Sequence, residues 1–231
     1  MGRRVDVSAY LVAGPENTLG RPLGDVVRAA VMAGFTCVQI RSKAASAREL
    51  ICCLREAAEA IEASGRSGRV PLLVDDRLDV ALAARDAGIR VDGIHVGQED
   101  IPPEVCRRYL GEDAIVGLSA RKKDIVAYVR ELDTRHIDYF GAGPLHETAT
   151  KPDSGRTADG RVVTRTPGEL EELARVSPVP VVVGGGVTAS DLPLLAKTGV
   201  AGFFVVSAVA GAEDPGAAAS ELVEIWKASR G

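Results

Sequence analysis

Eight short apolar runs, each followed by a stretch with helical character, constrain the fold of this chain more than any other feature. The runs occupy residues 9–12, 35–40, 70–74, 93–96, 115–118, 137–140, 179–183 and 202–206. They are rich in β-branched residues and apolar at successive positions, as is typical of strands that are buried on both faces of a parallel sheet. Regular alternation of such strands with helices predicts an α/β protein.

Helix-start signals fall between these runs. Ser46-Ala47-Arg48-Glu49 matches a capping box, in which the serine side chain and the glutamate three residues later satisfy free backbone N–H groups. Thr188 to Asp191 has similar capping potential, and Thr166-Pro167 and Asp214-Pro215 each place a proline at the first helical position. Further helices are predicted at residues 23–33, 78–86, 102–110 and 123–132.

Eight strands and eight helices within 231 residues predict one (β/α)8 barrel domain over residues 1–231. The competing prediction is an open doubly wound sheet. It is disfavoured because no Gly-x-Gly-x-x-Gly motif follows the first strand. Residues 153–164 are polar and contain two glycines, so we expect a long loop after strand six.

Composition excludes several classes of partner. The formal net charge is -4 and the pI is about 5.5, so no basic field attracts nucleic acid or acidic lipid. The first residues lack an apolar run of signal-peptide length, and the least polar run, 200–212, is shorter than the ~20 residues that span a bilayer. We therefore expect a cytoplasmic protein with small-molecule partners.

The thiols and imidazoles do not predict a zinc site or a disulfide framework. Two of the four cysteines, Cys52 and Cys53, are adjacent, and no Cys-x-x-Cys motif occurs. The histidines at 95, 136 and 146 have no ligand spacing with them. Buried reduced thiols are the expected state.

Charged side chains gather where predicted strands end, which is the catalytic face of a barrel. Alternation after strand two places Gln39, Arg41 and Lys43 on one side. Asp76 and Asp100 follow strands three and four. Magnesium is usually held by one or two carboxylates and substrate phosphates, so the pair predicts Mg2+ beside a pyrophosphate.

Two further segments have the chemistry of anion sites. Gly143 to Lys151 (GPLHETATK) follows strand six and combines glycine, hydroxyls and a lysine. Gly184 to Gly186 is a glycine turn into a helix start. Ser119 and Ser207 end strands five and eight. Two anion sites and a metal in one mouth predict a two-substrate reaction in which pyrophosphate leaves.

Each residue also has a purely structural interpretation. Asp75 or Asp76 can cap the helix near Leu78, and Asp100 can cap the next helix. The cations can be solvated surface charges, the glycines can form an ordinary turn, and His95 can be a core histidine. The functional interpretation depends on all of these residues falling at the same end of their strands.

These motifs resemble the thiamine-phosphate synthase family. The resemblance is carried by VQIRSK (38–43), DDRLDVALA (75–83), DGIHVGQEDIP (92–102), GPLHETATK (143–151), and GGGV with VVSA (184–187 and 205–208). It implies a (β/α)8 barrel that joins the pyrophosphate ester of hydroxymethylpyrimidine to the phosphate ester of hydroxyethylthiazole. The implied products are thiamine phosphate and pyrophosphate.

The resemblance implies a role for each matching residue. The pyrimidine pyrophosphate is expected to contact Gln39, Arg41, Lys43, Asp75, Ser119 and Lys151, of which Arg41, Lys43, Lys151 and Ser119 form the expected catalytic set. Asp76 and Asp100 are the expected Mg2+ ligands, and Thr148, Thr150, Gly186, Val206 and Ser207 the expected thiazole phosphate site. The implied chemistry is dissociative, with cations and metal stabilising the departing pyrophosphate.

Besides two segments that are longer than usual, residues 84–91 and 153–164, the sequence departs from the family pattern at three positions. Asp75 stands where asparagine is usual, Ala120-Arg121 replaces x-His after Ser119, and His146 stands where an aromatic is usual. His146 keeps open a thiazole tautomerase-like relative. A non-catalytic thiamine phosphate sensor is disfavoured because product binding does not require both Asp76 and Asp100. A homo-oligomer is compatible with the sequence, which does not fix the oligomeric state.

Overall fold

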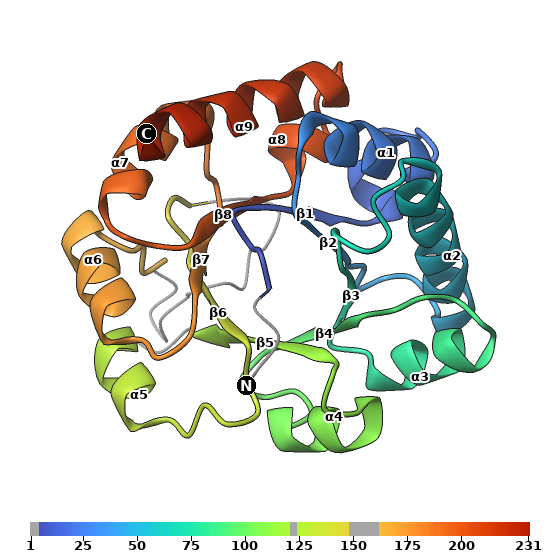
Figure 1. The fold of residues 1–231 in the computed structure, drawn as a ribbon, viewed down its shortest axis with the longest axis horizontal. Coiled ribbons are helices and arrows are strands. Elements are labelled where there is room, and N and C mark those ends of the chain that lie inside the picture. Colours follow the sequence, from blue (N-terminus) through green and yellow to red (C-terminus); the bar gives the residue numbers. More distant parts are fainter. Residues whose placement is uncertain (1–4, 121–123, 148–161) are drawn as a thin grey trace.

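The chain folds into a closed barrel of eight parallel strands, seen in a computed structural model that describes residues 5–120, 124–147 and 162–231. The strands follow one another around the barrel in chain order, and the last pairs with the first (Figure 1). They are β1 Ala9–Ala13, β2 Cys37–Ile40, β3 Leu72–Asp75, β4 Gly93–Val96, β5 Ile115–Ala120, β6 Tyr139–Ala142, β7 Val181–Val183 and β8 Gly202–Val205. The predicted (β/α)8 barrel is confirmed, and an open sheet is excluded.

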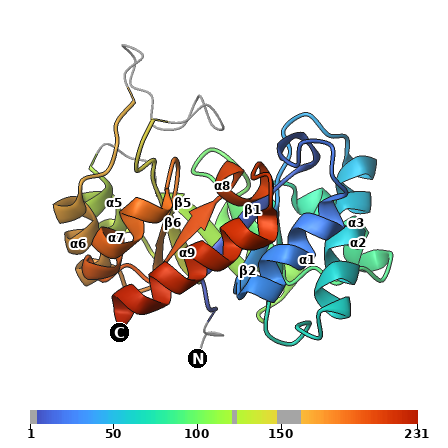
Figure 2. The same cartoon turned by 90° about the horizontal axis from the view of Figure 1, so that it is seen from above.

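Helices surround the strands as an outer ring (Figure 1). They are α1 Leu23–Ala33, α2 Ala47–Ala63, α3 Leu78–Asp86, α4 Pro103–Leu110, α5 Ile125–Glu131, α6 Pro167–Val176, α7 Leu192–Lys197, α8 Ser207–Ala210 and α9 Pro215–Arg230, with 3-10 turns η1 Pro15–Asn17 and η2 Ala189–Asp191. The four-residue α8 was not predicted. Figure 2 turns the barrel onto its side and shows α8 at the end where the strands finish.

The capping signals position these helices as expected. Ser46 accepts the N–H of Glu49, and the Glu49 carboxylate accepts the N–H of Ser46 at 2.7 Å, which completes the capping box of α2. Asp214 caps α9 through two backbone N–H groups. The box at Thr188 opens η2, and α7 begins only at Leu192.

Two apolar layers fill the molecule. Alternate strand residues such as Leu11, Val38 and Leu72 point outward and pack against the helices with no exposed surface. The residues between them point inward and form a second cluster inside the barrel, which includes Tyr10 and Tyr139. The barrel interior is therefore a packed core, open to ligands only near one end.

Ion pairs support the end of the barrel where the strands begin. Arg107 Nη2 donates to Asp138 Oδ2 at 2.7 Å, and the same oxygen accepts the N–H of Val116. Asp92 likewise accepts the N–H of Leu72 and pairs with Arg90. These charged side chains hold the starts of the strands in place. Chemistry is expected at the opposite end, where the strands finish.

Within the described ranges, no helix is long and apolar enough to cross a bilayer. All four cysteines are free thiols. Cys37, Cys53 and Cys106 are buried as predicted, whereas the prediction was wrong for Cys52, which is exposed on α2.

Candidate active site

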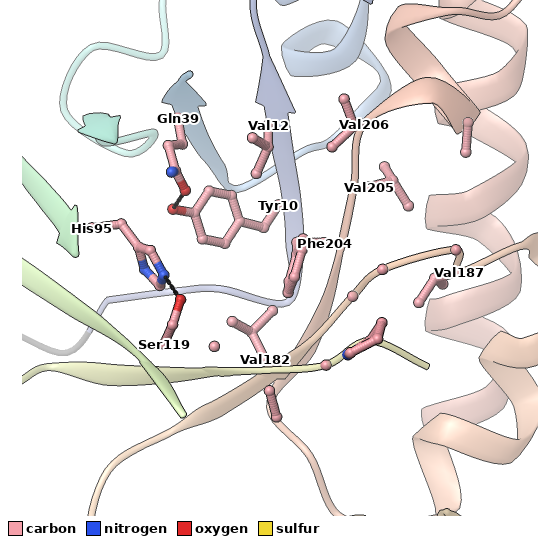
Figure 3. Close-up of a pocket in the computed structure, with 18 of the residues that line it drawn as sticks. Tyr10, Val12, Gln39, His95, Ser119, Val182, Val187, Phe204, Val205 and Val206 are labelled. Atoms are coloured by element: carbon pink, nitrogen blue, oxygen red, sulfur yellow. Dashed lines mark hydrogen bonds between the residues drawn. The ribbon is translucent and has the colours of Figure 1, made fainter. Parts of the chain in front are cut away.

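A cavity opens into the barrel at the end where the strands finish (Figure 3). Gln39, His95 and Ser119 line its inner side. Its other wall includes three residues expected from the sequence to hold a phosphate ester, Gly186, Val206 and Ser207. The structure thus brings Ser119, in β5, and the expected thiazole-side residues, which follow β7 and β8, around one cavity.

Asp75 lies at the centre of a charged cluster beside this cavity. Arg41 Nε is 3.1 Å from Asp75 Oδ2, an ion pair whose N–H is not aligned for a hydrogen bond, and Lys43 Nζ is 3.6 Å from the same oxygen. The Gln39 amide donates to Asp75 Oδ1. The carboxylate that departs from the family pattern is therefore balanced by the two cations expected to bind pyrophosphate.

Asp76 follows β3 in the left-handed backbone region, with φ 56°. Its N–H donates to the carbonyl of His95 at 2.8 Å, and its carboxylate accepts from Lys43. Burial alone raises the pKa of Asp76, but hydrogen bonds, first from Lys43, outweigh it, and the pKa lies below its usual range. The capping alternative for Asp75 and Asp76 is wrong, because Arg77 occupies the N-cap of α3 without a side-chain cap.

Asp100 meets Asp76 across the mouth of the barrel. Partial burial, and next the neighbouring Asp76, raise the pKa of Asp100. Asp100 Oδ2 accepts the N–H of Gly97 at 2.9 Å, which fixes the loop after β4. Its capping alternative is also wrong, since Pro102 is the N-cap of α4.

This pair of carboxylates is a donor set that suits Mg2+. The two side chains come from consecutive strands and lie within hydrogen-bonding reach of each other. Among the described residues, no group of three or more His, Cys, Asp or Glu side chains is arranged to hold a metal. Two carboxylates completed by ligand oxygens and water are the usual magnesium arrangement, whereas zinc needs more protein ligands.

A chain of buried polar side chains crosses the barrel interior beneath the cavity. It runs Asp75, Gln39, Tyr10, Tyr139, His95, Ser119, and we call it the polar relay. Its contacts beyond Asp75 are Tyr10 Oη–Gln39 Oε1 at 2.6 Å, Tyr10 Oη–Tyr139 Oη at 2.7 Å, His95 Nδ1–Tyr139 Oη at 2.9 Å and His95 Nε2–Ser119 Oγ at 2.9 Å. Figure 3 shows Tyr10 directed at Gln39 and His95 directed at Ser119.

Tyr10 and Tyr139 were not predicted as part of the site, and for His95 the sequence offered a core position as the structural alternative. Burial raises the pKa of both tyrosines well above the usual value, so the hydroxyls act as neutral hydrogen-bonding groups. The sequence signal that could have indicated these buried rings is a pair of glycines inside strands, Gly117 and Gly141, because a strand glycine often marks a close approach by another group. A Cβ at Gly117 would lie 2.2 Å from Tyr139 Cζ, and one at Gly141 would lie 3.0 Å from His95 Cε1.

The glycine turn after β7 interlocks with the loop after β6. Gly185 and Gly186 have φ values of 83° and 75°, a region that favours glycine. A Cβ at Gly186 would lie 2.9 Å from the Cβ of His146. The His146 N–H donates to the carbonyl of Gly185 at 2.9 Å. Close packing against the loop after β6 therefore requires glycine in this turn, whether or not a ligand binds there.

Some expected residues lie outside the described ranges. These are Thr148, Thr150, Lys151, Arg121 and most of the predicted loop 153–164. Their expected roles stay predictions.

Comparison with known proteins identifies the family. Residues 9–209 match the family model for thiamine monophosphate synthase. The chain is 43% identical to the thiamine-phosphate synthase of Corynebacterium efficiens over 94% of both chains, and 37% identical to that of Syntrophomonas wolfei over 96% of this chain and 97% of the other. The thiamine phosphate pyrophosphorylase structure from Pyrococcus furiosus superposes with a TM-score of 0.78 at 29% identity, covering 99% of each chain. This chain belongs to the thiamine monophosphate synthase family, whose named members are transferases.

Proposed function

We propose that the protein joins the pyrophosphate ester of hydroxymethylpyrimidine to the phosphate ester of hydroxyethylthiazole, giving thiamine phosphate and pyrophosphate. One observation carries this proposal. The cations Arg41 and Lys43 and the carboxylates Asp76 and Asp100 form one cluster around Asp75. Asp75 accepts from Gln39, which lines the cavity together with Ser119 and Ser207. This arrangement supports the proposal, because the cluster carries charge suited to a leaving pyrophosphate and the neighbouring pocket is mostly apolar, as suits two heterocycles.

The charged cluster is expected to exchange partners when substrate binds. Asp75 and Asp76 hold Arg41 and Lys43 in the free protein. Pyrophosphate oxygens compete for the same cations, and Lys151 is proposed to join them. Mg2+ held by Asp76 and Asp100 would neutralise charge on the leaving pyrophosphate. The side chains thereby lower the cost of breaking the bond between the pyrimidine methylene carbon and oxygen.

The opposite wall of the cavity is proposed to hold the nucleophile. Gly186, Val206 and Ser207, with Thr148 and Thr150, would hold the thiazole phosphate, so that the thiazole nitrogen faces the pyrimidine methylene. A thiazole nitrogen has a free lone pair and needs no general base. The protein's contribution is therefore orientation and exclusion of water.

The test is a product assay with both substrates and Mg2+, measuring pyrophosphate and thiamine phosphate in equal amounts. Release only when both substrates are present supports the proposal. Tight binding of thiamine phosphate without turnover would instead identify a sensor. Isomerisation of a thiazole phosphate without pyrophosphate release would identify a tautomerase-like enzyme.

A further inference from the structure

The polar relay contains enough information to assign every proton along it. The Asp75 carboxylate, paired with Arg41, accepts from the Gln39 amide, so the carbonyl oxygen of Gln39 faces the other way. That oxygen has no proton and must accept from the Tyr10 hydroxyl. The reverse orientation of Gln39 would set its carbonyl oxygen against the carboxylate.

The same logic continues across the barrel. Tyr10 has a single hydroxyl proton and has donated it to Gln39, so in its contact with Tyr139 it is the acceptor. Tyr139 therefore donates to Tyr10, and its own oxygen accepts from Nδ1 of His95. His95 must carry a proton on Nδ1.

We propose that His95 is neutral, that the relay fixes it as the Nδ1–H tautomer, and that Ser119 is thereby a hydrogen-bond acceptor toward the cavity. Nε2 of that tautomer has a lone pair and accepts the Ser119 hydroxyl proton at 2.9 Å. Ser119 Oγ then presents only lone pairs to a ligand. It selects a ligand that offers an N–H or O–H donor, and resting on the proposed function, that donor is the amino group of the pyrimidine.

The surroundings keep the relay in this arrangement. Tyr10 and Tyr139 are 1% and 0% exposed, so water does not compete for their hydroxyls. The rings of Tyr139 and His95 occupy space that Gly117 and Gly141 leave open, because a Cβ at either glycine would approach those rings too closely. Both His95 ring nitrogens are engaged, which ties the ring orientation to Tyr139 and Ser119 together.

The relay also has an electrostatic direction. Every hydroxyl, amide and ring N–H in it points toward Asp75, so the bond dipoles align and reinforce one another. The Ser119 end presents the negative side of this series to the cavity. In the proposed reaction, positive charge develops on the pyrimidine as pyrophosphate departs, and this end faces that charge. Tyr139 and His95 are thus positioning residues that act through Ser119.

The direct test is 15N NMR of the histidine ring nitrogens in the free protein at neutral pH. Only three histidines are present, and His136→Gln and His146→Gln assign the signals by elimination. A protonated Nδ1 and an unprotonated Nε2 at His95 are the expected result. An Nε2–H tautomer, an equal mixture of the two tautomers, or protons on both ring nitrogens would overturn the proposal. The wild-type measurement requires no altered side chain.

Tyr139→Phe removes the acceptor for Nδ1–H and keeps the ring. We expect the His95 tautomer to shift toward Nε2–H, which lets Ser119 donate to the cavity. The matched control is Tyr109→Phe, which removes a hydroxyl from an exposed tyrosine on α4 and leaves the spectrum of His95 unchanged. A His95 tautomer that is unaffected by Tyr139→Phe would show that the relay does not set it.

A binding experiment tests the acceptor role. The probes are 4-amino- and 4-methoxy-5-hydroxymethyl-2-methylpyrimidine, neither of which carries a leaving group, titrated with pyrophosphate and Mg2+ present. Wild type should prefer the amino compound, and Tyr139→Phe should reduce that preference at least about tenfold. An unchanged preference overturns the acceptor role. Failure of both compounds to bind wild type would count against the proposed function, while the NMR result still decides the relay.

Discussion

His146 Nε2 lies 2.8 Å from Asp191 Oδ1, which ties the loop after β6 to the turn after β7. His146 is half-exposed and is not among the residues lining the cavity. The same Asp191 accepts from the backbone and hydroxyl of Thr188, so it serves as both a cap and an anchor. His146, which stands where the family usually has an aromatic, therefore has a structural partner.

We expect His146→Gln to retain synthase turnover to within about threefold, because an exposed pair contributes little. A glutamine can still reach Asp191. Steady-state pyrophosphate release is the measurement, with His136→Gln as the control at the opposite end of β6. A loss of several orders of magnitude would place His146 in the chemistry and revive the tautomerase-like alternative.

Asp191 should give the protein a defined acid sensitivity. Partial burial raises the pKa of Asp191, but the hydrogen bonds from His146 and Thr188 outweigh it and hold the pKa below its ordinary value of 3.8. A carboxyl with a depressed folded-state pKa contributes stability above the unfolded value, and this is lost as pH falls through the folded value.

The corresponding experiment compares Asp191→Asn with wild type in urea unfolding at pH 6 and near pH 3. Wild type should be more stable by up to ~1 kcal/mol at pH 6, and the difference should shrink at the lower pH. A difference that grows on acidification would contradict the assigned direction of the shift.

Gly186→Ala should weaken thiazole phosphate binding at least about tenfold, because a displaced turn moves that wall of the cavity. Gly88→Ala is the matched control. Gly88 has φ 72°, close to the 75° of Gly186, but a Cβ there meets nothing within 4 Å. Both substitutions should cost about 1 kcal/mol or more in backbone strain. Calorimetric titration with the thiazole phosphate measures the difference, and equal affinities in the two variants would refute a role for the turn.

Asp76→Ala should lower turnover by about a hundredfold or more at saturating Mg2+, with binding of thiazole phosphate retained. The control is Asp79→Ala, which removes an exposed carboxylate paired with Arg77 on α3. Turnover is followed by pyrophosphate release. Unchanged turnover in Asp76→Ala would remove this residue from the site.

Asp75→Asn should tighten binding of inorganic pyrophosphate with Mg2+ by roughly three- to tenfold, since a competing negative charge beside Arg41 and Lys43 is lost. The asparagine oxygen still accepts from Gln39. Titration calorimetry measures the affinity. Weaker binding would show instead that Asp75 is needed to orient the two cations.

Much of the fold could be predicted because its signals are local. The apolar runs located all eight strands, and Ser46, Thr166 and Asp214 cap helices where their side chains indicated. The helix α8 was missed because four residues show no helical period.

The site was predicted only in part. Its charged residues stand at strand ends, where the sequence pattern reveals them, whereas the tyrosines and histidine of the polar relay lie inside strands and were missed. An inward-facing tyrosine in a strand has the same sequence pattern as any core aromatic. Tyr10 and Tyr139 are 129 positions apart, and only the closed register brings their hydroxyls together. The tether between His146 and Asp191 was missed for the same reason, since no local signal encodes a contact 45 residues distant.

The order of strands in the relay has a consequence for folding. β1 to β4 form one half of the barrel and β5 to β8 the other. The relay passes from Tyr10 in the first half to Tyr139 in the second, returns to His95 and ends at Ser119. A half-barrel alone leaves each of these contacts without its partner. If Ser119 selects the ligand as proposed, that selection requires both halves of the barrel to be in place, and substrate preference would then report completed assembly.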